Sequence, residues 1–143
     1  MRRIDIAFLL LATLCLLTGV TMGIVMGIAH DFQLAPVHAH LNLVGWASLA
    51  LFGLIYKAYP VLARSPLATA HFAAASIGST AFPFGIYLSI AHQNPALAIG
   101  ASLLWLVGVI AFLVNLARFA FASPIPRRDR TASDHALEAL GGY

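Results

Sequence analysis

Four long apolar stretches, joined by short polar links, most limit how this chain can fold. A membrane-spanning helix takes about 20 apolar residues, and the 143 residues hold four such helices with little left over. Only 9% of the residues are charged, whereas soluble domains carry about 25%. We therefore predict an all-α integral membrane protein with four transmembrane helices, at about 6–29, 36–59, 67–91 and 96–121. This transmembrane domain takes up 1–122, and a cytoplasmic polar tail follows over 123–143.

The basic residues predict how the helices are oriented. They precede the first span, flank the link between the second and third, and end or follow the fourth: Arg2, Arg3, Lys57, Arg64, Arg118, Arg127, Arg128 and Arg130. With four spans these places share one side of the membrane, and the positive-inside rule makes that side cytoplasmic. We expect a multi-pass protein of a bacterial-type inner membrane with both termini in the cytoplasm. The basic residues form no patch with interleaved aromatic residues, so nucleic-acid binding is not expected.

Two further patterns concern helix faces and helix ends. Gly19, Gly23 and Gly27 recur at every fourth residue of the first span, so they lie on one face. Small residues let another helix, or a flat ligand, approach closely.

Tyr56 and Tyr59 close the second span at its cytoplasmic end, where aromatic side chains with polar tips commonly lie at the membrane interface.

The start of the second span carries the most polar chemistry at the edge of any apolar stretch. There His38 and His40 are followed by Asn42. A single histidine near a span end commonly bonds only to a carbonyl or to water, but ionisable residues within spans are rare and usually functional. Because a helix turns about 100° per residue, the two imidazoles point about 200° apart. They therefore suit two sites, or two neighbouring protomers, better than one shared metal.

The remaining histidines are weaker candidates. His30 and His92 lie toward the same outer side as the pair, and His92 is a secondary cofactor-binding candidate. His71 lies near the inner end of the third span, and His135 lies in the tail.

Neutral imidazole suits zinc, copper and iron. A zinc enzyme usually has three protein ligands in a pattern such as H-E-x-x-H, which this chain lacks. Haem needs only one or two axial ligands and apolar walls.

The second span resembles a known family. Along this span the polar, aromatic and small residues run in the order His38, His40, Asn42, Trp46, Phe52, Gly53, Tyr56 and Pro60. This order resembles that of the haem-binding helices in the catalytic subunit of haem-copper oxidases and nitric oxide reductases. It implies haem b as the cofactor, with His38 and His40 as iron ligands that face two different haems. In that family twelve helices form three arcs of four, so three copies of a four-span chain would rebuild the ring.

The chain also departs from that family. It has no two adjacent histidines for a copper site, and its outer side has no Lys or Arg to meet haem propionates. The resemblance therefore does not extend to oxygen or nitric oxide reduction, and we make no prediction of catalysis. The expected function is haem binding for electron transfer with a redox partner, for gas binding or for haem handling.

Two other functions stay open on the sequence. One is a non-enzymatic protein that holds copper or zinc for assembly, through His30, His38, His40 and His92. The other is a structural membrane subunit whose histidines only cap helices. We further predict a homo-oligomer, most simply a trimer with haem between protomers, because His38 and His40 face opposite ways. A two-fold dimer with one shared site is the rival.

Overall fold

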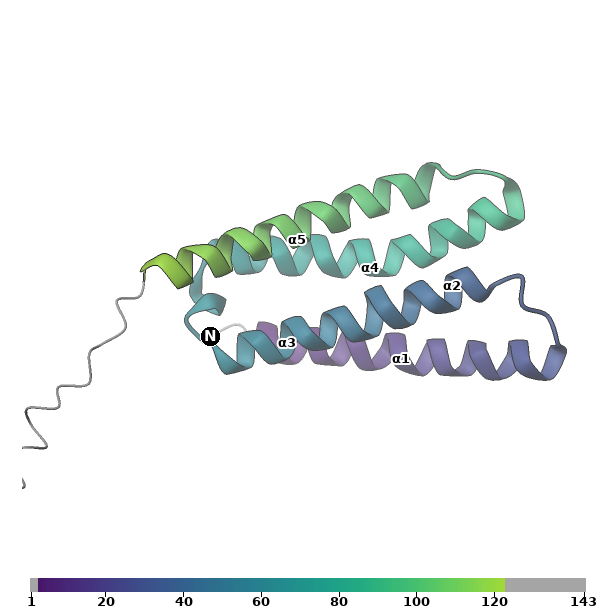
Figure 1. The fold of residues 1–143 in the computed structure, drawn as a ribbon, viewed down its shortest axis with the longest axis horizontal. Helices are drawn as coiled ribbons and strands as arrows, with labels where there is room; N and C mark the ends of the chain where they lie inside the picture. The colour runs from purple at the N-terminus through teal and green to yellow at the C-terminus, as the bar shows by residue number, and fades with distance from the viewer. Residues whose placement is uncertain (1–2, 123–143) are drawn as a thin grey trace, which may run out of the picture.

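The computed structural model describes residues 3–122 and confirms an all-α, four-helix architecture (Figure 1). Each span is long and apolar enough to cross a bilayer, and the described residues contain no strand. The elements are α1 (Ile4–Ala29), α2 (Ala35–His40), the π-helix η1 (Leu41–Ala47), α3 (Ser48–Ala58), the 3-10 helix η2 (Leu62–Arg64), α4 (Pro66–His92) and α5 (Ala96–Ala122). The second span is thus α2, η1 and α3 in one continuous rod. The predicted tail, with His135, lies outside the described residues.

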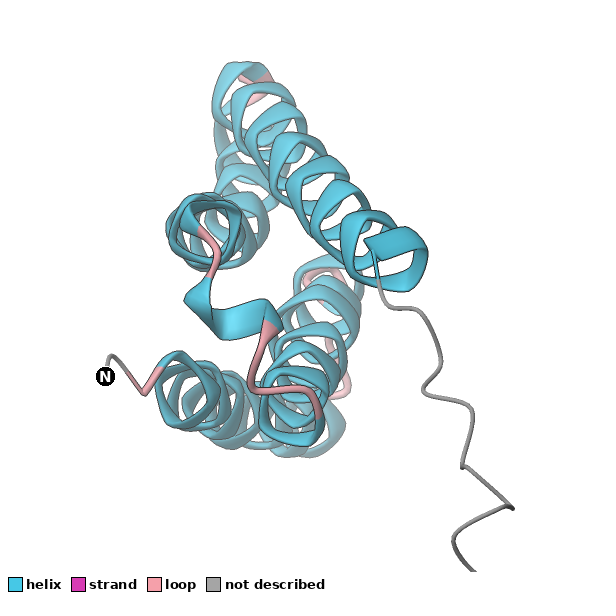
Figure 2. Cartoon of the chain, turned by 90° about the vertical axis from the view of Figure 1, so that its left-hand side faces the viewer, coloured by secondary structure: helices cyan, strands magenta, loops and turns pink. Residues whose placement is uncertain are grey.

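The spans form two hairpins that lie side by side. α1 packs along the second span, and α4 packs along α5, while α4 makes most of the contacts between the hairpins (Figures 1 and 2). The start of α1, the link at η2 and the end of α5 lie together, and we call this the basic end after Arg3, Lys57, Arg64 and Arg118. The links at 30–34 and 93–95 lie at the opposite end, which we call the histidine end (Figure 1).

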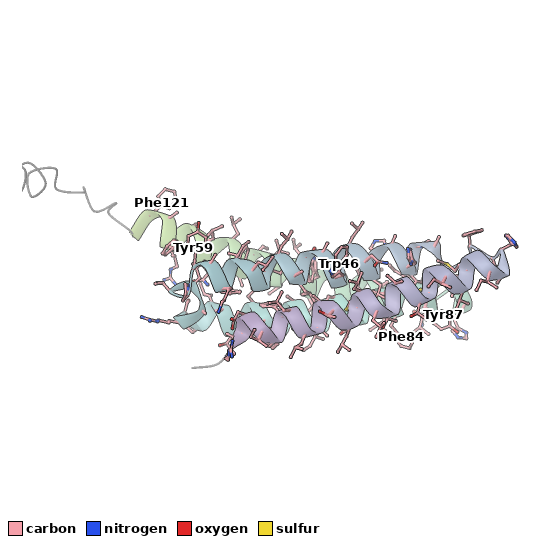
Figure 3. All side chains as sticks on the ribbon, turned by 90° about the horizontal axis from the view of Figure 1, so that it is seen from below. Trp46, Tyr59, Phe84, Tyr87 and Phe121 are labelled. Atoms are coloured by element: carbon pink, nitrogen blue, oxygen red, sulfur yellow. The ribbon has the colours of Figure 1, made fainter. Side chains whose placement is uncertain are left out.

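The outside of the bundle is apolar. Leu14 and Leu17 of α1 and Leu103 and Leu113 of α5 are all more than half exposed. A helix that is hydrophobic all round belongs in lipid or in a large core, so these faces are suited to a bilayer. The five aromatic side chains labelled in Figure 3 all stand on the outside, with Tyr59 and Phe121 near the basic end.

Tyr56 differs from the sequence-based expectation of an interfacial position. Its side chain is only 1% exposed and stacks on Phe8 of α1 with ring centroids 5.8 Å apart. The face of α3 that carries Tyr56 points into the bundle, where the hydroxyl finds a partner on α4. Tyr59, which follows the helix, is exposed as expected.

Small residues allow the second hairpin to pack closely. A Cβ built on Gly85 would collide with the backbone of Ala98, and one on Gly78 would lie 2.9 Å from the backbone nitrogen of Trp105. At the basic end, the buried Asn115 of α5 donates from Nδ2 to the carbonyl oxygen of Leu62 at 3.0 Å. This bond ties α5 to the link between the hairpins.

Candidate functional site

His38 projects from α2 toward α1. Its Nδ1 lies 2.9 Å from the carbonyl oxygen of Gly19. A carbonyl oxygen only accepts hydrogen bonds, so Nδ1 carries the proton, and in the neutral imidazole Nε2 then keeps its lone pair. The amide nitrogen of Asn42 also lies near this Nδ1, but at the longer distance of 3.4 Å. The shorter contact with Gly19 therefore favours the tautomer of His38 whose Nε2 can ligate a metal.

The glycine face of α1 is what lets His38 approach. A Cβ on Gly23 would lie 2.9 Å from Cε1 of His38, and one on Gly19 would lie 2.5 Å from Nδ2 of Asn42. Asn42 donates to the backbone carbonyl of His38 at 2.9 Å. The predicted glycine face thus packs within the chain at Gly19 and Gly23, whereas Gly27 has no atom within 4 Å of a built Cβ.

His40 is oriented by a different set of contacts. Its Nδ1 lies 2.7 Å from the carbonyl oxygen of Pro36, one turn earlier. Its ring meets Phe82 of α4 edge-on, with centroids 4.9 Å apart. The same tautomer argument leaves Nε2 of His40 with its lone pair. His38 therefore contacts α1 and His40 contacts α4, and both side chains are only half-buried.

The π-helical segment η1 begins at the residue after His40. The backbone N–H of Ser48 bonds to the carbonyl of Leu43, five residues earlier, and the Ser48 hydroxyl donates to the same oxygen at 2.8 Å. In its middle, Gly45 packs against Cys15 of α1 so closely that a Cβ would lie 2.9 Å from the sulfur. π-helical turns are rare and often occur at functional sites. The sequence offered no signal for this one.

The other two histidines of the histidine end do not join the pair in a metal cluster. His30 follows α1 with a left-handed backbone (φ 54°), and His92 lies in the last turn of α4; both are exposed. Among residues 3–122, no three His, Cys, Asp or Glu side chains form a group that could hold a metal ion. The described part of one chain therefore presents separate imidazoles rather than a multidentate site.

A second polar pair lies near the basic end and was not predicted as a pair. His71 of α4 is fully buried, and its Nδ1 lies 3.0 Å from the Tyr56 hydroxyl. The rings of Phe8, Phe52 and Phe112 surround it, with centroids 5.2, 4.5 and 5.0 Å from that of His71. Its Nε2 has no hydrogen-bond partner. A lone histidine inside an apolar span was the only sequence signal for it.

His71 is well separated from the first pair. Tyr56 follows His40 by 16 positions in the same rod, which is roughly 24 Å at the rise of an α-helix. The closely packed aromatic rings leave His71 facing side chains rather than a cavity. It is therefore a packed polar group of the core, unlike the half-buried His38 and His40 and the exposed His30 and His92.

Comparison with known proteins assigns neither a family nor a function to this chain. The chain matches no protein-family model, no characterised protein and no solved structure. The resemblance to haem-copper oxidases therefore rests on the second span alone and stays a prediction. The donor chemistry of the site fits haem iron, which takes single histidines as axial ligands. It does not fit a structural zinc site, which takes four ligands.

Proposed function

We propose that this protein binds haem b in the membrane and that Nε2 of His38 or His40 is the axial ligand. One observation carries the proposal: the Nδ1 atom of each imidazole is hydrogen-bonded to a backbone carbonyl oxygen, at 2.9 Å for His38 and 2.7 Å for His40. Metal-bound histidines almost always donate their other ring N–H in this way, which fixes the ring and raises its basicity. Haem, when bound, supplies one-electron chemistry or gas binding.

The protein itself orients the two histidine rings and provides apolar surroundings for the proposed haem. Gly19 and Gly23 position the His38 ring against α1, and Phe82 supports the His40 ring from α4. Leu43 and Trp46, on η1 just beyond the histidines, are 65% and 40% exposed. Exposed apolar side chains on the turns that follow the two histidines suit the hydrophobic wall that a porphyrin needs.

The proposed assembly is a homotrimer with haem between protomers. His38 and His40 contact different helices, so one chain offers half of each of two sites. Closed cyclic symmetry lets each protomer supply one histidine to each neighbour. The proposed location is a bacterial-type inner membrane with both termini in the cytoplasm, supported by basic residues gathered at one end of the bundle.

The decisive experiment is the absorption spectrum and metal content of the full chain purified in mild detergent. We expect a Soret band that His38→Ala or His40→Ala removes or shifts, while His92→Ala has a smaller effect and His135→Ala has none. A preparation that stays colourless but retains copper or zinc would favour a metal-handling protein. A colourless and metal-free preparation would favour a structural subunit.

A further inference from the structure

A cavity opens at the basic end of the bundle, far from the proposed haem site. Its volume is about 660 Å³, within the range of about 300–1,000 Å³ typical of small-molecule sites. The start of α1, the end of α3, the link at η2 and the start of α4 form its walls, and Figure 2 views the bundle from this end. We call it the basic-end pocket. No histidine lines it.

The charge of this pocket favours an anion. Arg3, Lys57 and Arg64 line it, with Asp5 as the one acidic side chain, so three positive charges minus one negative give a net charge of +2. Two long helices, α1 and α4, also begin at its wall, with Ile4 and Pro66 among the lining residues. The positive ends of helix dipoles add to the attraction for a negative group.

The pocket also has an apolar side that a free anion would not use. Pro60, Ala63 and Tyr56 contribute apolar wall. A second hollow of about 170 Å³ shares three lining residues with the pocket and continues to Ala7 and Phe72. It therefore extends the pocket along the seam between α1 and α4, deeper into the apolar part of the bundle.

We propose that the basic-end pocket binds an anionic phospholipid, with the phosphate headgroup against Arg3, Lys57 and Arg64 and one acyl chain in the α1–α4 seam. The pocket lies at the end of the spans, which is where headgroups lie when such helices cross a bilayer. Basic pockets between membrane helices are known to bind anionic headgroups. Because α1 and α4 belong to different hairpins, a lipid held between them links the two hairpins at their less closely packed junction.

Native mass spectrometry of the full chain in mild detergent tests this with phosphatidylglycerol and phosphatidylcholine as probes. We expect the protein to retain phosphatidylglycerol in preference to phosphatidylcholine. The affinity for phosphatidylglycerol should fall about fivefold for each lining cation that is removed, as in Lys57→Gln and Arg64→Gln. Arg64→Lys keeps the charge and should keep the lipid. Arg118→Gln is the matched control, since Arg118 is exposed on α5 near the same end and does not line the pocket.

Equal retention of both lipids would overturn the proposal, and so would equal losses from Arg118→Gln and Arg64→Gln. A second arm separates a lipid from a small anion with the same phosphate chemistry. Ala7→Phe fills the seam and should release phosphatidylglycerol, while excess inorganic phosphate should not displace it. Displacement by phosphate, with no effect of Ala7→Phe, would assign the pocket to a small anion and refute the lipid. Unchanged thermal midpoints without added lipid would show that the variants are folded.

Discussion

Nδ1 of His38 lies 2.9 Å from the carbonyl oxygen of Gly19, and this bond joins the second span to the middle of α1. The contact exists because Gly19 and Gly23 leave the surface of α1 open to an imidazole and an amide. The same glycines therefore pack the first hairpin and set the tautomer of the candidate ligand. A change to this face should alter the stability of the hairpin and the state of His38 together.

The first prediction compares two glycines of one face. In Gly23→Ala the new methyl would lie 2.9 Å from Cε1 of His38, so the ring must move and its bond to Gly19 must weaken. Overpacking of this kind costs about 1–3 kcal/mol, and we expect a lower thermal midpoint and a perturbed Soret band. Gly27→Ala is the matched control because its methyl meets no atom within 4 Å. Equal effects of the two variants would show that the His38 contact is not responsible.

The second prediction concerns the ligand role of His40 rather than its packing. In His40→Gly the imidazole is absent, and free imidazole in the buffer can occupy the vacated space beside Phe82. We expect the haem spectrum to be lost in the variant and partly recovered with millimolar imidazole, because the ligand atom is then supplied again. His40→Phe retains a ring but no nitrogen and should not respond to imidazole. A variant that keeps an unchanged spectrum in buffer alone would rule out His40 as the ligand.

The third prediction tests the buried Tyr56–His71 pair. Tyr56→Phe removes the hydroxyl 3.0 Å from Nδ1 of His71 and leaves both ring nitrogens without partners, since Nε2 already has none. An unsatisfied buried polar group costs about 1–3 kcal/mol, which we expect as a lower free energy of unfolding. Adding His71→Leu should recover most of the loss, because replacing both partners by apolar groups can be nearly neutral.

Tyr59→Phe is the control for that pair, since Tyr59 is 49% exposed at the same end of the span. It should change the stability little. If Tyr56→Phe also leaves the free energy of unfolding unchanged, the hydrogen bond contributes nothing measurable to stability. If the double variant is less stable than Tyr56→Phe alone, the His71 ring contributes mainly through its packing against the aromatic cluster.

The fold could be predicted from the sequence, but the site only in part. The length and apolar character of four segments suffice for four spans, because helices satisfy their backbone groups within each segment. The π-helical turn at Leu41–Ala47 could not be predicted, since it depends on contacts such as Gly45 with Cys15 on another helix. Likewise Tyr56 and His71 lie on different spans, and no local sequence pattern indicates that their side chains are in contact. His38 and His40 are candidates because ionisable residues within spans are rare and usually functional, and their role as ligands stays a prediction.

The fourth prediction concerns orientation in the membrane. The histidine-end links carry no Lys or Arg, and the basic end gathers Arg3, Lys57, Arg64 and Arg118. The positive-inside rule then places the basic end in the cytoplasm. Reporter fusions at Gln33 and Asn94 should report the outer side, and a fusion at Arg64 the inner side. An inner signal at Gln33 or Asn94 would contradict the orientation and place the candidate haem on the cytoplasmic side.

The last prediction is the oligomeric state of the haem-loaded protein. Half-buried His38 and His40 contact different helices of one four-helix bundle, and a haem needs walls on both of its faces. A second protomer can supply the missing wall, and the exposed apolar faces of α1 and α5 offer surface for it. Native mass spectrometry in mild detergent should show a trimer with haem in equimolar ratio to chains, and His38→Ala with His40→Ala should remove the haem. A two-fold dimer with one shared haem would favour symmetric ligation by one type of histidine. A monomer with a full complement of haem would refute the shared site and require both axial positions to be filled within one chain.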